Sequence, residues 1–127
     1  MKVKGAAIAA CFGSLLWGNA AYADGWPTSV AGNWSVVANQ SSGTLSITQP
    51  ASNLNCRPIT GTFVGTSIEG FYCPFSGRLV FVRKNAGGFT FQYYQGNLSW
   101  SGNTLRIGGS FSSLNNSYGE YSFYGTK

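Results

Sequence analysis

Short stretches of alternating apolar and polar residues run along most of the chain, from residue 33 to residue 124. Glycine, serine and asparagine separate them about every eight to twelve residues, and no stretch has apolar residues at helical spacing. Alternation with a period of two is typical of β-strands with one face in a core, and such frequent turns favour a sandwich or a barrel. We predict strands over residues 33–38, 44–49, 58–64, 66–73, 78–84, 89–100, 104–113 and 118–124.

The connections between these eight stretches are short, which makes strands that follow one another in sequence neighbours in space. Residues 41–43, Ser-Ser-Gly, are predicted as a turn, and Gly65 as the centre of a tight hairpin. This order is an antiparallel meander, and eight meandering strands lose their exposed edges when the sheet closes on itself. The fold class that we expect is therefore all-β, an eight-stranded antiparallel up-and-down barrel.

The alternation also assigns the side chains to two faces. One parity carries most of the large apolar residues, and we expect it to face the interior. The other parity is mostly polar, and we expect it to face solvent together with Tyr94, Tyr118 and Tyr124. The expected interior set is Trp34, Val36, Leu45, Ile47, Leu79, Phe81, Phe89, Phe91, Tyr93, Leu105, Ile107, Phe111, Tyr121 and Phe123.

The N-terminus carries the three parts of a secretory signal peptide. Lys2 and Lys4 are basic, residues 6–17 are almost wholly apolar, and residues 21–23, Ala-Tyr-Ala, offer the small residues of a cleavage site. This apolar run is shorter than the roughly 20 residues that span a bilayer, so we expect no stable membrane insertion. We predict a signal peptide over residues 1–23, a single β-barrel domain over residues 24–127, and a secreted or periplasmic protein.

Two cysteines, Cys56 and Cys73, remain once residues 1–23 are removed. An even pair in an exported domain indicates a disulfide, and a lone pair without any histidine is a poor zinc site. The two cysteines also flank the predicted hairpin symmetrically about residues 64–65. We therefore predict a Cys56–Cys73 disulfide, and we expect neither a metal ion nor a cofactor.

Several classes of chemistry are disfavoured by composition. The chain has no histidine, which removes the commonest general base and the usual catalytic triads. Without residues 1–23 the net charge is +3, from six basic and three acidic residues that are scattered along the chain, so we expect no nucleic-acid partner. Glu69 and Glu120 are a possible glycosidase pair, but we expect them to form ordinary surface ion pairs with Arg78 or Arg106. The sequence favours a protein that is not an enzyme.

Aromatic side chains are abundant and supply the candidate ligand-binding residues. Most of the phenylalanines are expected to fill the core. Tyr93, Trp100 and Tyr121 combine an apolar body with a hydrogen-bonding tip, which suits a binding site inside the mouth of a barrel. We predict that these three residues bind the ligand.

The chain resembles the avidin/streptavidin-like group of small calycin-type barrels, related in architecture to the lipocalins. Residues 32–34, Gly-Asn-Trp, match the Gly-x-Trp at the start of the first strand, and residues 119–123, Gly-Glu-Tyr-Ser-Phe, resemble the last strand. The resemblance covers residues 32–124 and implies the barrel fold. The family's biotin-contacting asparagine and the last-strand Asp or Asn correspond to Val36 and Tyr121, so the resemblance does not imply biotin as the ligand.

Two functions from different classes follow. The first is a secreted or periplasmic non-catalytic binding module that takes a small, largely apolar ligand at the barrel mouth. The second is a protein-interaction module, such as an enzyme inhibitor or a host-interaction factor, acting through loops at residues 50–55 and 114–117. An open cavity of a few hundred cubic ångströms favours the ligand, and a filled lumen favours the protein partner.

The cleavage site gives a first prediction. The exported protein should begin at Asp24, because residues 21–23 place alanine at the two positions that signal peptidase reads. N-terminal sequencing of the mature form checks this. A start at a lipidated Cys11, which follows Ile8-Ala9-Ala10, would contradict it.

Overall fold

The computed structural model describes residues 22–23, 25–115 and 118–127 of the 127-residue chain. The predicted signal peptide and Asp24 lie outside the described residues, except for residues 22–23. Among the described residues there is no helix of the length and apolarity needed to cross a membrane. The strands are β1 (Tyr22–Ala23), β2 (Trp26–Pro27), β3 (Gly32–Ala38), β4 (Ser41–Thr48), β5 (Arg57–Phe63), β6 (Thr66–Cys73), β7 (Arg78–Lys84), β8 (Thr90–Ser101), β9 (Thr104–Ser113) and β10 (Gly119–Thr126).

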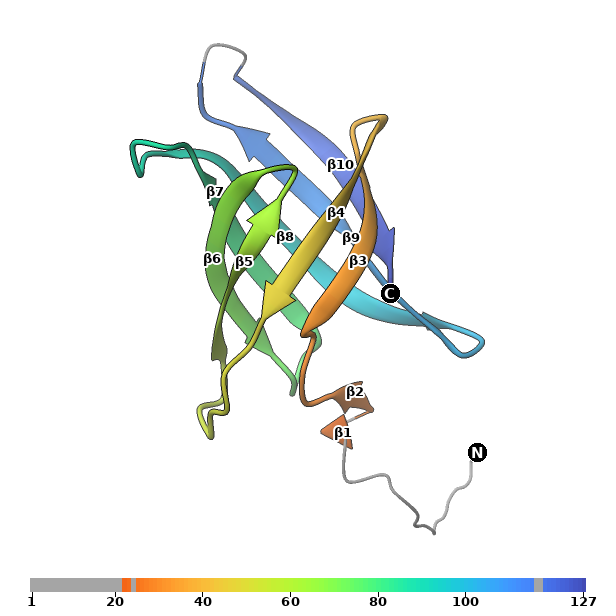
Figure 1. Cartoon of the computed structure of the whole chain (residues 1–127). Coiled ribbons are helices and arrows are strands. Elements are labelled where there is room, and N and C mark those ends of the chain that lie inside the picture. Colours follow the sequence, from red (N-terminus) through yellow and green to blue (C-terminus); the bar gives the residue numbers. More distant parts are fainter. Residues whose placement is uncertain (1–21, 24, 116–117) are drawn as a thin grey trace, which may run out of the picture.

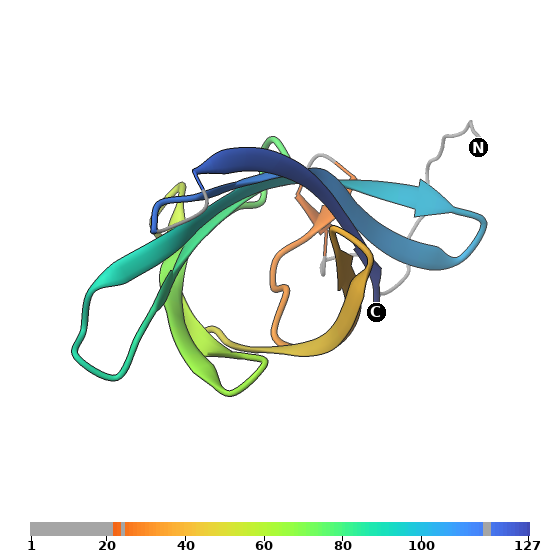
Figure 2. The same ribbon diagram turned by 90° about the horizontal axis from the view of Figure 1, so that it is seen from above.

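Strands β3 to β10 form one closed barrel in which each strand pairs antiparallel with its neighbours in sequence, and β10 closes the ring on β3 (Figures 1 and 2). The predicted all-β, eight-stranded up-and-down barrel is confirmed. The strand bounds agree with the alternation of the sequence to within a few residues. Because the strands alternate in direction, the turns after β3, β5, β7 and β9 share one end of the barrel, which we call the open end.

The first hairpin turns earlier than predicted. Ala38 pairs with Ser41, so the turn is Asn39-Gln40, and residues 41–43 belong to β4. Both turn residues have positive φ, 46° and 75°, as a two-residue turn of this handedness requires. The turn contains no glycine, whereas residues 41–43 end in Gly43. The turn was therefore predicted two residues too late in the sequence.

Apolar side chains on the inner face of the sheet fill the barrel. Most of the predicted interior set is buried, and Trp34, Leu45, Leu79, Phe81, Ile107, Phe111 and Phe123 are all at most 5% exposed. For the predicted strand over residues 89–100, which includes most of β8, the assignment of faces was wrong. Tyr94 is inside and 1% exposed, whereas Tyr93 is 39% and Phe89 73% exposed.

A bulge explains the reversal on β8. Arg83 pairs with Gln92, but Lys84 pairs with Thr90, so Phe91 is an extra residue in the ladder. One extra residue moves every later side chain of a strand to the other face. The inward residues after the bulge begin with the polar Gln92 and include Gly96. In the sequence, this mixture of polar and small residues is typical of a strand face exposed to solvent.

The other end of the barrel is closed by residues 26–31, which lie across the ring of strands (Figure 2). Val30 is fully buried, and its carbonyl accepts a 3.0 Å hydrogen bond from the indole of Trp34. Gln49 holds the same segment twice, accepting from Val30 N and donating to Thr28 O, both at 3.0 Å. This plug was not predicted from the sequence.

Tyr72 and the disulfide hold the same closed end. The Tyr72 hydroxyl donates to Pro27 O at 2.6 Å, and Arg57 donates to Thr28 O at 3.2 Å. The predicted Cys56–Cys73 disulfide is confirmed, with an S–S distance of 2.02 Å. Burial raises the pKa of Tyr72 to about 12, and the charge of Arg57 opposes part of that rise. The phenol is therefore a neutral donor to the plug.

Stability should consequently fall as the pH rises above 10. In the unfolded chain Tyr72 ionises near pH 10, but in the folded barrel only near pH 12, so the folded state binds more protons in that interval. The free energy of unfolding should drop by at most about 1.4 kcal/mol per pH unit from this group. Denaturant titrations from pH 8 to pH 12 measure the slope for wild type, Tyr72→Phe and, as a control on the outer wall, Tyr124→Phe. Equal slopes for wild type and Tyr72→Phe would contradict the assignment.

Candidate functional site

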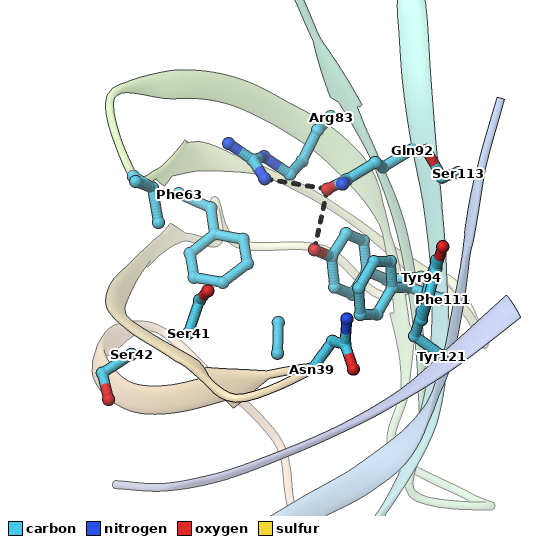
Figure 3. Close-up of a pocket in the computed structure, with 12 residues that line it drawn as sticks. Asn39, Ser41, Ser42, Phe63, Arg83, Gln92, Tyr94, Phe111, Ser113 and Tyr121 are labelled. Atoms are coloured by element: carbon cyan, nitrogen blue, oxygen red, sulfur yellow. Dashed lines mark hydrogen bonds between the residues drawn. The ribbon is translucent and has the colours of Figure 1, made fainter. Parts of the chain in front are cut away.

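The open end of the barrel contains a half-open pocket of about 340 Å³ (Figure 3). Its lining comes from seven of the eight barrel strands, all except β6, and from two hairpin turns. Apolar rings form the bottom, and polar side chains lie around the sides. Binding pockets for small molecules have this composition and begin at about 300 Å³.

The floor of the pocket is the top of a packed aromatic cluster. Tyr94 lies between Phe81 and Phe111, with both ring centroids 4.7 Å away and interplanar angles of 6° and 13°. The edges of the same ring meet Phe63 at 5.7 Å and Phe123 at 5.2 Å in T-shaped contacts. These five rings occupy the middle of the lumen, so the space for a ligand is above them.

A short hydrogen-bond network rises from this floor. The Tyr94 hydroxyl and Arg83 Nη1 both donate to Gln92 Oε1 at 2.8 Å. Two donors on one oxygen fix the Gln92 amide in a single orientation. Burial raises the pKa of the Tyr94 phenol, with Arg83 opposing part of the rise, so the hydroxyl stays a neutral donor at neutral pH.

Two hydrogen bonds and two aromatic rings fix the position of Arg83. Its Nε donates to Thr66 Oγ1 at 2.8 Å, in addition to the bond to Gln92. Its guanidinium carbon lies 5.0 Å from the Phe63 ring centroid and 4.9 Å from that of Phe91, within the range of a cation–π contact. The cation therefore has a fixed position at the edge of the pocket.

Two strained turns form part of the rim. Asn39-Gln40 and Val64-Gly65 are both two-residue turns with positive φ, and Val64 has φ of 48°. A β-branched residue in this region is an outlier, because its side chain crowds the backbone. Val64 also lines the pocket and is 59% exposed. Strain of this kind often accompanies a functional site.

The three ligand-binding residues predicted from the sequence are not brought together. Tyr121 lines the pocket, and its ring centroid is 5.3 Å from that of Phe111. Tyr93 lies on the outer wall opposite Val82. Trp100 lies toward the closed end, where its indole donates to Gly25 O at 3.2 Å.

Of the twelve residues that line the pocket, only Tyr121 was predicted as a site residue. The eleven that were missed include the three residues of the hydrogen-bond network, Arg83, Gln92 and Tyr94. Gln92 and Tyr94 were hidden by the bulge at Phe91. Arg83, however, follows Leu79 and Phe81 at the inward parity of β7. A charged residue in register with two core residues was a usable signal.

Glu69 and Glu120 lie on opposite sides of the barrel. Their strands, β6 and β10, are four strands apart in either direction round the ring, and both side chains are on the outer wall. Glycosidase carboxyl groups lie within about 10 Å of each other, so these two cannot act as a pair. The expected partners were also wrong for Glu69, which forms its ion pair with Lys84 at 2.9 Å.

The loops suggested for protein binding lie at opposite ends of the molecule. Residues 50–55 join β4 to β5 at the closed end, and residues 114–115 follow β9 at the open end. Residues 116–117 are outside the described part of the chain. A single interface would therefore have to use one of these loops without the other.

Comparison of the chain with protein-family models, curated proteins and solved structures finds no match. The barrel is the fold that the resemblance to the avidin group implies, and the family itself stays a prediction. Over the described residues, no three His, Cys, Asp or Glu side chains gather as a metal site would need. The chemistry of the pocket must therefore be inferred from its own side chains.

The strained turn gives a testable prediction. Val64→Asn should raise the free energy of unfolding by roughly 1 kcal/mol, because Asn-Gly suits a turn with two positive φ angles and Val does not. Val64→Ala is the control, since alanine shortens the side chain but still disfavours this backbone conformation. Chemical denaturation of the three proteins measures the difference. A Val64→Asn protein no more stable than Val64→Ala would show that the turn is not strained.

Proposed function

We propose that this protein is a non-catalytic binding module that takes a small ligand with a planar, largely apolar body at the open end of its barrel. The observation that carries the proposal is the half-open pocket of about 340 Å³ above the stacked rings of Tyr94 and Phe111. Phe81 and Phe111 cover both faces of Tyr94, so a ligand above these rings meets their edges, and a planar body suits edge-to-face contact with them. Because the lumen below is filled, the ligand must be small enough to bind within the mouth.

Polar groups around the floor provide orientation. Tyr94, Gln92 and Arg83 are preorganised by hydrogen bonds to one another. Next to Gln92, its partner on β9, Ser113, donates to Asn115 at 3.0 Å, and Asn39 and Ser41 lie at the rim across the pocket. A few fixed polar groups on an apolar surface are the usual basis of specificity in such pockets.

The side chains that line the pocket support binding rather than catalysis. Among them there is no carboxylate, thiol or imidazole. Burial raises the pKa of Tyr94, so its phenol stays protonated at neutral pH and is a poor general acid or base. General acid–base catalysis favours a group whose pKa lies near the working pH. The polar groups of the mouth thus suit holding a ligand in place.

Export to the periplasm or the extracellular space is part of the proposal. The Cys56–Cys73 disulfide is consistent with an oxidising compartment, where such bonds persist. The predicted signal peptide points to the same compartment. A ligand would then reach the open end directly from the surrounding medium.

A protein partner at the open end is the second candidate, because exposed apolar side chains gather there. Phe89 is 73% exposed, Tyr118 82%, Val64 59% and Leu114 45%. They lie in or beside the turns that surround the mouth. Exposed aromatic residues around a packed centre are typical of protein interfaces.

Titration with indole, followed by amide chemical shifts, tests the ligand proposal. At millimolar indole we expect saturable shifts at residues of the mouth such as Tyr121 and Ser113. Ser41→Trp should abolish them, because position 41 has the inward parity of β4 and a large ring there fills the pocket. Thr44→Trp, on the outer parity of the same strand, is the matched control.

Two results would contradict the proposal: mouth resonances that do not respond to indole, or shifts that survive in Ser41→Trp. Shifts confined to Phe89, Leu114 and Tyr118 would favour the protein-binding alternative. The folded state of each variant is checked by the dispersion of its amide spectrum.

A further inference from the structure

Arg83 is a cation at the edge of the pocket without an anionic partner in the structure. Over the described residues the one ion pair is Lys84–Glu69, on the outer wall. The other half-buried arginines donate their hydrogen bonds to groups away from the pocket. Arg57 donates to the carbonyls of Leu54 and Thr28 at the closed end, and Arg78 donates to Asn97 and Gln95 on the outer wall.

The guanidinium of Arg83 is fixed but not saturated. Of its five N–H groups, hydrogen bonds use one on Nε and one on Nη1, to Thr66 and Gln92. Its Nη2 donates to none of the residues that the structure describes. Figure 3 shows the group beside Gln92 and near Phe63, and Arg83 is one of the residues that line the pocket. Donors are therefore available at a place where a ligand would lie.

The electrostatic setting favours an anion there. The Phe63 and Phe91 rings, at 5.0 and 4.9 Å from the guanidinium carbon, replace part of the water around the charge. A partly desolvated cation attracts an opposite charge more strongly than an exposed one does. Gln92 and Thr66 are neutral, so they orient the cation without neutralising it.

We propose that the ligand of this site is a carboxylic acid with a ring-sized apolar body. Its carboxylate pairs with Arg83, and its body lies over Tyr94, Phe111 and Tyr121. The planar guanidinium fork matches a carboxylate, whereas a phosphate dianion would call for more than this one cation. Lys84 does not supply a second cation, because its ammonium pairs with Glu69 on the outer face. This inference rests on the proposed binding function.

The test compares indole-3-acetate with indole-3-acetamide, which have nearly the same size and differ in charge. In the wild-type protein the carboxylate should bind about tenfold more tightly or better, the gain expected of a charge-assisted hydrogen-bonded pair. Dissociation constants come from amide shift titrations, and the Arg83 side-chain Nε–H signal should move with the carboxylate alone. The preference should shrink at high salt, because the pair is partly exposed.

Arg83→Gln should bind both probes equally, at about the affinity of the amide in the wild-type protein. Arg78→Gln is the matched control, since it removes the same charge from the outer wall and should keep the preference. Arg83→Met is the second variant. It retains a flexible apolar side chain near Phe63 and Phe91, and it should also lose the preference.

The outcomes separate this inference from the function on which it rests. If both probes bind at the mouth equally well in the wild-type protein, the carboxylate proposal is wrong and the binding function stands. The same conclusion follows if Arg83→Gln keeps the preference. If neither probe, nor indole, shifts any resonance of the mouth, both proposals fail together.

Discussion

The packing of Tyr94 between Phe81 and Phe111 determines which part of the barrel is filled and which part is open to another molecule. Two stacked contacts at 4.7 Å and two edge contacts with Phe63 and Phe123 fill the middle of the lumen. An eight-stranded barrel is just wide enough for its own side chains, so one such cluster leaves little room for anything else. The hydroxyl of the same tyrosine projects upward to Gln92. Tyr94 is thus both the top of the core and the floor of the candidate site.

The closed end explains why the barrel has one mouth. The plug of residues 26–31 is held by Trp34, Gln49, Arg57 and Tyr72, and the Cys56–Cys73 disulfide joins the strands next to it. These bonds satisfy the carbonyls of an irregular segment in a half-buried place, where unpaired polar groups would cost free energy. Rigidity at this end and exposed turns at the other are consistent with ligand entry from one side.

The sequence predicted the architecture well because alternation and turn spacing are local signals, and the disulfide agreed with the strand register. The site and the plug at the closed end were predicted poorly, for three physical reasons. The bulge at Phe91 exchanged the faces of Tyr93 and Tyr94, and a single extra residue has no clear mark in a run rich in aromatics. The plug has no periodicity, since it is held by side chains distant in sequence. Arg83 was visible at the inward parity of its strand, but only the folded barrel shows it without an ion-pair partner.

The most direct measurement of the central claim, a lumen filled by Tyr94 and its neighbours, is the response of isotope-labelled protein to xenon. Dry apolar cavities bind xenon, and close-packed interiors do not. The methyl resonances of Ile59 and Leu79, both 1% exposed inside the barrel, should not change with xenon pressure in the wild-type protein. Tyr94→Ala, which removes the central ring, should gain saturable shifts at the same methyl groups. Saturable xenon shifts at Ile59 and Leu79 in the wild-type protein would contradict the account, because they would place an open cavity beneath the proposed floor.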